Sequence, residues 1–225
     1  DDSRSVVRPL LSVAMQHSCA TGTTLTQLAL SSFWMSGRNH RPLEFFTAGT
    51  DLGFTGFELS GIHADTFYDE VRPGDFRIIS LHDPAPPTPG HARMGSKELR
   101  RADIVYTSLD ETRRRQAIAL TKNSIDVAVN YGAQVIILHI GQTSSVSHSE
   151  KDLKQLFVEG RIHSPEADAL RSQIATERWN QHAEHMEALH RSLDELVAYA
   201  SVRSIRLGLE NRPVHEIAGF SEMGE

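Results

Sequence analysis

The chain has 225 residues, of which 39% are hydrophobic and 23% charged, a globular composition with enough length to bury one substantial core. Its formal net charge of −6 lacks the basic surplus typical of phosphate-backbone binders, which makes nucleic acid an unfavoured partner. The single cysteine, Cys19, excludes an intrachain disulfide and favours the reducing cytoplasm, and the apolar runs are shorter than the ~20 residues of a membrane span. We expect a cytoplasmic domain over residues 24–225, preceded by a tail or leading helix over residues 1–23.

Five short segments share one pattern, a β-prone apolar run that ends in a polar residue. They are LTQLALSSFW (25–34), FTGFELSG (54–61), FRIISLHDP (76–84), QVIILHIG (134–141) and SIRLGLENRP (204–213). Such runs predict strands that are buried on both faces, as in parallel sheets. Helical patterns lie between the runs, so the chain is predicted to have a parallel α/β fold.

Two of the intervening helices have readable ends. Ser108 and Glu111 form a capping-box pattern for a helix that stops at Gly132. A longer helix is predicted from Ser164, with a proline in its first turn, to about Ala200. One stripe of this longer helix is expected to face the core: Trp179, Ala183, Met186, Leu189, Leu193, Leu196 and Ala200.

Charged and imidazole side chains on these helices are interpreted as surface groups. Residues 113–115 are three arginines in the first turns of the earlier helix, where we expect solvent exposure. His182, His185 and His190 follow one another at helical spacing on the longer helix, which is compatible with metal binding but more typical of a solvated polar face.

Two parallel architectures fit alternating strands and helices, an open doubly wound sheet and a βα barrel. The segment after the first predicted strand, SSFWMSGRN, lacks the glycine-rich turn of a dinucleotide-binding sheet. A TIM-type (β/α) barrel is therefore favoured. Because a full barrel needs about 250 residues and eight strands, we expect a partial barrel with about five of the eight βα units.

Three predicted strands end in a residue that can bind a divalent metal: His82, His139 and Glu210. In a barrel the carboxyl ends of the strands converge, and a metal ion would offset the cost of burying a carboxylate there. The alternatives are a satisfied core or loop position for each histidine and a buried ion pair for Glu210. The mixed donor set leaves Mn, Zn, Mg and Co open.

Four further residues are candidate substrate contacts. Glu58, on the second predicted strand, can face a polyol or form an ordinary ion pair. Trp34 can stack on a sugar ring or serve in packing. Asn211 and Arg212 offer donors to hydroxyls or a phosphate, with structural ion pairing as the alternative for the arginine.

The sequence resembles the xylose-isomerase-like TIM barrels, which include sugar phosphate isomerases and epimerases, inosose dehydratases and the endonuclease IV type of enzyme. The resemblance covers residues 24–225. Its components are LALSSFWMSGR, GFTGFELSG, SLHDPAPP, SLDETRRRQAIALTKNSIDVAVNYGAQVIILHIG and RLGLENRP. As a set they are specific for the superfamily but not for a substrate.

The resemblance implies a metal-dependent sugar or sugar-phosphate isomerase or epimerase, in which Glu210 binds the metal and acts as an acid/base group. His82 and His139 match metal ligands of the endonuclease-type members, whereas in the epimerases the equivalent positions more often line the substrate pocket. The alternatives are a metal-dependent phosphodiesterase acting on abasic DNA and a noncatalytic barrel fragment.

The family also supplies an aspartate, a histidine and a second glutamate from strands six to eight, and the sequence stops at Glu225 before any of these. We therefore expect a chain truncated after the fifth strand. A partial barrel completed by a second copy of the chain and a short noncatalytic relative are the other two interpretations. Enzyme activity is expected of the complete protein.

Overall fold

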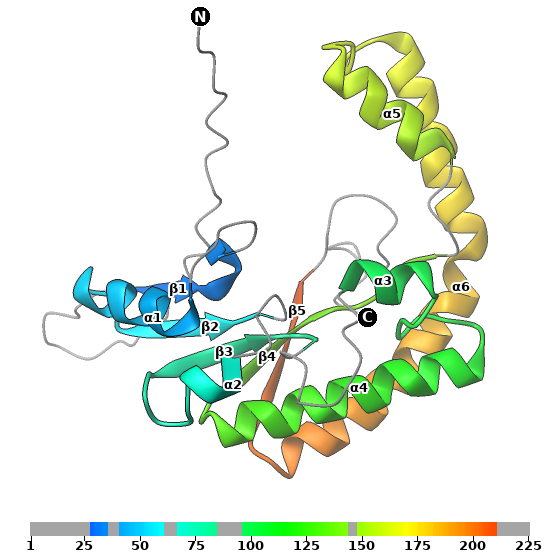
Figure 1. The fold of residues 1–225 in the computed structure, drawn as a ribbon. Helices are drawn as coiled ribbons and strands as arrows, with labels where there is room; N and C mark the ends of the chain where they lie inside the picture. Colours follow the sequence, from blue (N-terminus) through cyan, green and yellow to red (C-terminus); the bar gives the residue numbers. More distant parts are fainter. Residues whose placement is uncertain (1–27, 36–40, 61–66, 85–95, 144–147, 211–225) are drawn as a thin grey trace, which may run out of the picture. The chain divides into compact units, whose positions relative to one another are not determined.

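The structure is a computed structural model that describes residues 28–35, 41–60, 67–84, 96–143 and 148–210 (Figure 1). The predicted tail over residues 1–23 lies outside this part of the chain. The elements are β1 (Ala29–Ser31), the 3-10 helix η1 (Ser32–Met35), α1 (Pro42–Asp51), β2 (Gly56–Leu59), α2 (Phe67–Glu70), β3 (Ile78–His82), α3 (Ser96–Arg101), α4 (Glu111–Asn130), β4 (Val135–His139), α5 (His148–Val158), α6 (Pro165–Ser201) and β5 (Arg206–Glu210).

All five predicted strands are present, each shorter than its predicted segment, in one sheet with the order β1-β2-β3-β4-β5. The β1–β2 and β2–β3 pairs are parallel, which confirms the α/β prediction. In doubly wound folds the first strand lies inside the sheet, whereas in a barrel consecutive strands are neighbours. The sequential order is therefore that of five successive barrel strands.

The chain divides into two compact units, the first formed by residues 1–93 and 124–136. Its described core is a cluster of aromatic rings between α1 and the strands β2 and β3. The ring centroids of Phe46 and Phe57 lie 4.9 Å apart, and those of Phe46 and Phe76 lie 5.1 Å apart. The Tyr131 hydroxyl donates to the Val71 carbonyl at 2.8 Å, and burial raises the pKa of Tyr131 to about 12.

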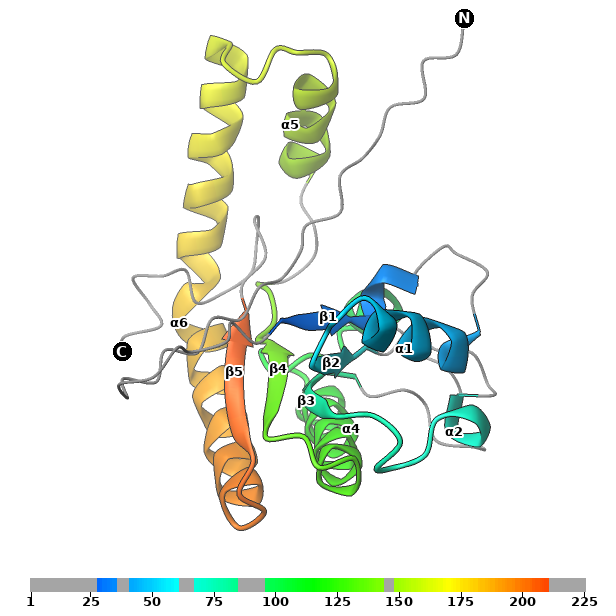
Figure 2. The ribbon, with the colours of Figure 1, turned by 90° about the vertical axis from the view of Figure 1, so that its left-hand side faces the viewer.

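The second unit is formed by residues 94–123 and 137–225. In its described part, α5 lies beside the N-terminal half of the long helix α6, and β5 follows the C-terminal end of α6 (Figure 2). Ser164 caps α6 by accepting from the Ala167 amide at 3.2 Å, and Pro165 occupies the first turn, as predicted.

The predicted capping box of α4 is wrong. Oδ1 of Asp110 accepts from the amides of Thr112 at 2.9 Å and Arg113 at 3.2 Å, so Asp110 is the N-terminal cap. The Ser108 hydroxyl instead donates to Asp103 at 2.5 Å. The predicted end is confirmed: α4 stops at Asn130, and Gly132 follows with a φ of 71°, which only glycine adopts without cost.

Four side chains on these helices depart from their predicted exposure. Trp179 is 73% exposed and stacks on His182, and Ala183 is exposed as well. Met186 and Leu189 of the same stripe are buried, as predicted. His185 is 4% exposed and not solvated.

Arg114 is buried as well, at 3% exposure, although Arg113 and Arg115 on either side of it are exposed as expected. Its guanidinium is satisfied by two contacts. It binds Glu111 in bidentate fashion at 2.7 and 3.1 Å and donates to the Ser192 hydroxyl of α6 at 3.1 Å.

β4 and β5 are not buried on both faces, contrary to the prediction. In β4, Ile136 and Leu138 are fully buried, while Val135, Ile137 and His139 between them remain partly exposed. The pattern in β5 is exposed or intermediate throughout. Among the described residues, no helix combines the length and apolar character needed to cross a bilayer.

Candidate functional site

Three predicted metal ligands each form the last residue of a strand: His82 ends β3, His139 ends β4 and Glu210 ends β5. Side chains alternate between the two faces along a strand. Since Leu138 is fully buried, its neighbour His139 belongs to the more open face, and the same alternation separates His82 from the buried Leu81. The three residues lie at the carboxyl ends of successive strands, which is the end of a βα barrel that carries the active site.

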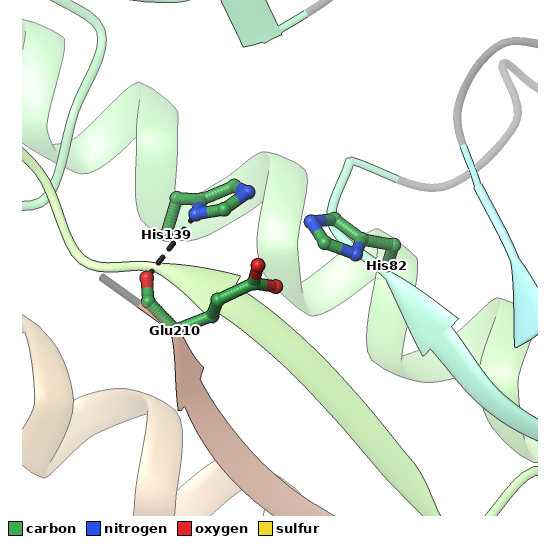
Figure 3. Close-up of side chains that lie close together, drawn as sticks. All are labelled: His82, His139 and Glu210. Atoms are coloured by element: carbon green, nitrogen blue, oxygen red, sulfur yellow. Dashed lines mark hydrogen bonds between the residues drawn. The ribbon is translucent and has the colours of Figure 1, made fainter. Parts of the chain in front are cut away.

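In the second unit, His139 is fixed by the main chain of β5. Its Nδ1 lies 3.1 Å from the carbonyl oxygen of Glu210. Figure 3 marks this hydrogen bond with a dashed line. A carbonyl only accepts, so Nδ1 must carry the proton of this hydrogen bond. In the neutral ring, Nε2 then keeps its lone pair and is the atom available to a metal.

The loop after β4 is held close to the segment before α4. Gly141 has a φ of 124°, and a Cβ atom there would lie 2.5 Å from Oγ1 of Thr107. The Thr107 hydroxyl donates to the Gln142 carbonyl at 2.7 Å and accepts from the Gln142 amide at 3.0 Å. Nδ1 of the buried His185 lies 2.7 Å from the Thr107 carbonyl. These contacts fix the backbone that follows His139.

In the first unit, Glu58 is held by the strands on both sides of β2. The hydroxyl of Ser31 donates to its Oε1 at 2.9 Å and that of Ser80 to its Oε2 at 3.1 Å, while Nδ1 of His82 lies 3.8 Å from Oε1. Burial raises the pKa of Glu58, but His82 and the two hydroxyls more than offset it and hold the pKa below its ordinary value. Glu58 is therefore favoured as a carboxylate.

The remaining predicted contacts are placed as follows. Trp34 lies in η1 and stacks on Phe45 of α1, with ring centroids 6.0 Å apart, which is a packing contact. Asn211 and Arg212 lie outside the described residues. Their substrate contacts stay predictions.

Sequence reasoning missed the hydroxyl groups that support these side chains. Ser80 lies two residues before His82, so strand alternation alone places both on one face of β3. Thr107 and His185 gave no such signal, because the contact of Thr107 with Gln142 spans 35 positions and that of His185 with Thr107 spans 78.

No protein-family model and no curated protein sequence matches this chain. Solved structures do. A D-tagatose 3-epimerase-like protein is 16% identical, with a TM-score of 0.44 over 82% of this chain and 52% of that chain. An L-ribulose 3-epimerase is 15% identical, with a TM-score of 0.48 over 82% and 49%. A xylose isomerase domain protein from Planctomyces limnophilus is 15% identical, with a TM-score of 0.41 over 80% and 52%. The chain spans about half the length of these structures.

Proposed function

We propose that His82, His139 and Glu210 bind one divalent metal ion and that the protein acts as a metal-dependent sugar or sugar-phosphate isomerase or epimerase. The observation that supports the metal site is that three residues able to bind a metal each end one of the successive strands β3, β4 and β5. Two of the three, His139 and Glu210, meet within the second unit, where the imidazole contacts the Glu210 carbonyl (Figure 3).

The donor set fits a transition metal. Two imidazole nitrogens and one carboxylate oxygen suit zinc, manganese or cobalt, whereas magnesium prefers oxygen ligands. The hydrogen bond of His139 supports the same assignment, because it leaves the Nε2 lone pair for the ion. Three protein ligands also leave coordination positions open for substrate oxygens.

The proposed reaction is a proton transfer beside a carbonyl, and its substrate class comes from the sequence resemblance. When bound, the ion would hold the carbonyl and hydroxyl oxygens of a sugar and stabilise negative charge on them. Glu210 would move the proton between carbon and its carboxylate oxygen. Glu210 is an exposed residue of β5. Trp34, Glu58, Asn211 and Arg212 remain proposed substrate contacts.

The metal site is tested by titrating the metal-free chain with Co²⁺ and following its visible absorption. We expect one ion per chain, with affinity falling at least about tenfold in each of the variants His82→Ala, His139→Ala and Glu210→Gln, because loss of even an outer-shell partner of a ligand typically costs about 10- to 100-fold. His190→Ala is the matched control, since His190 is exposed on α6 and lies outside the site.

Two results would overturn the proposal. One is the absence of stoichiometric binding by the wild-type chain. The other is equal binding by the three ligand variants and the His190→Ala control. For the reaction itself, the measurement is exchange of solvent deuterium into a ketose at the carbon beside its carbonyl. Exchange that persists in Glu210→Gln at the wild-type rate would remove Glu210 from the mechanism.

A further inference from the structure

Glu58 is paired across the sheet with two serines, one on each neighbouring strand. Register pairs Ser31 of β1 with Glu58 of β2, and Glu58 with Ser80 of β3. Paired residues of neighbouring strands place their side chains on the same face, and His82, two residues after Ser80, belongs to that face too. A carboxylate thus lies between two strands that each supply a hydroxyl, beside a proposed metal ligand.

Both oxygens of the carboxylate are engaged. Ser31 donates to Oε1 at 2.9 Å and Ser80 to Oε2 at 3.1 Å, so the group is fixed from two sides. These bonds limit rotation of the carboxylate and use one lone pair on each of its oxygens. The carboxylate is therefore held in place beside the imidazole of His82.

The imidazole contact involves one particular nitrogen. Nδ1 of His82 lies 3.8 Å from Oε1 of Glu58, an ion-pair distance that is longer than a hydrogen bond. A carboxylate beside Nδ1 favours a proton on that atom and leaves Nε2 as the metal-binding atom. In His139 the Glu210 carbonyl has the same effect on Nδ1.

We infer that Glu58 is a positioning residue, which orients the His82 ring and fixes Nε2 as its ligand atom for the divalent ion. The inference rests on the proposed metal site and deepens it. Ser31 and Ser80 extend the support by holding the carboxylate, so residues of three successive strands act on one ligand. Removal of such a carboxylate typically lowers metal affinity by about 10- to 100-fold.

The test is a double-mutant cycle on Co²⁺ affinity, read from the visible absorption band of the bound ion. Glu58→Gln keeps the side-chain volume and removes the charge, and Glu44→Gln is the matched control on the exposed face of α1. We expect Glu58→Gln to weaken binding about tenfold or more and to alter the absorption band, while Glu44→Gln changes neither. In a His82→Ala background the Glu58→Gln effect should disappear, because the two residues act as one unit.

Each outcome decides a different claim. Equal affinities of Glu58→Gln and Glu44→Gln would overturn the positioning role and leave the metal site intact. A Glu58→Gln effect that is unchanged in the His82→Ala background would also overturn it, since Glu58 would then act independently of His82. Absence of Co²⁺ binding by the wild-type chain would instead overturn the proposed function. Glu58→Asp, which keeps the charge, should recover part of the lost affinity and serves if Glu58→Gln does not fold.

Discussion

Gly141 shows how a single residue controls the loop that follows a proposed ligand. Its φ of 124° is unfavourable for residues with a side chain, and Thr107 fills the space that a Cβ atom would need. We expect Gly141→Ala to lower the free energy of unfolding by about 3 kcal/mol, from backbone strain and overpacking together. Chemical denaturation measures the change.

Gly160 provides the comparison for this prediction. It also has a positive φ, 73°, but no heavy atom lies within 4 Å of a Cβ built there. Gly160→Ala should therefore cost only about 1 kcal/mol. If both variants lose the same stability, close packing against Thr107 has no energetic role.

At the scale of single residues, the sequence predicted that the three residues of the proposed metal site end strands, but it did not predict their hydrogen-bond partners. His82, His139 and Glu210 were identifiable because each follows an apolar run within one segment. The hydrogen bond from His139 to the Glu210 carbonyl spans 71 positions, and no local pattern encodes a contact of that separation. Only the register of the strands creates it.

Among the elements, α4 and α6 are joined by a buried arginine. Arg114 is enclosed between Glu111 and Ser192, while the side chain of its neighbour Arg113 is 51% exposed. We expect Arg114→Ala to lower the free energy of unfolding by about 2 kcal/mol or more, and Arg113→Ala to change it by less than about 0.5 kcal/mol. Equal losses in denaturant titrations would contradict the structural role of Arg114.

Ionisation of Glu150, a residue of α5, is expected to make the stability of the chain depend on pH. Burial, with a smaller contribution from Glu177, raises the pKa of Glu150 to about 7 from its ordinary value of 4.5. Between these values the folded chain retains a proton that the unfolded chain has released, so stability falls as pH rises from about 4.5 to about 7.

Glu150→Gln removes this dependence. We expect the variant to unfold at a higher temperature than the wild type at pH 8 and at the same temperature at pH 4, because the wild-type carboxyl is protonated there in both states. Glu184→Gln, at an exposed position of α6, is the control. An equal gain at both pH values would mean that ionisation of Glu150 is not the cause.

Helices were predictable from sequence where their end signals are local. Ser164, Pro165 and Gly132 act within a few residues of the helix end, and all three predictions are confirmed. The capping box at Ser108 was wrong because two acceptors compete nearby, and Asp110 is the residue that meets the free amides. Arg114 is buried by contact with Ser192 of α6, which lies 78 positions away in the sequence. The residues around Arg114 therefore do not predict its burial.

For the whole molecule, charge separates the proposed function from its alternative. With a net charge of −6, the chain lacks the surplus of Lys and Arg that neutralises phosphates in duplex binding. We expect no saturable binding to a labelled abasic duplex at physiological salt in fluorescence anisotropy. Saturable binding that weakens with added salt would favour the phosphodiesterase alternative.

Strand order is the feature of the whole chain that sequence reasoning anticipated. Five apolar runs, with no glycine-rich turn after the first, predicted a barrel segment, and the sheet order β1-β2-β3-β4-β5 agrees. Equal burial of both strand faces was not observed, because the exposure of each face depends on what covers it and not on the strand sequence alone.

Helix α6 is far longer than the strand that follows it. Its 37 residues extend about 55 Å, whereas the five residues of β5 extend about 17 Å. In the described part of the chain, its buried side chains are Ala167 near the start and then seven between His185 and Ala200. One continuous helix should therefore have two levels of amide protection. Hydrogen–deuterium exchange should be fast over residues 168–184, together with α5, and slow over residues 186–200, which would make the outer half of this helix a separate opening unit.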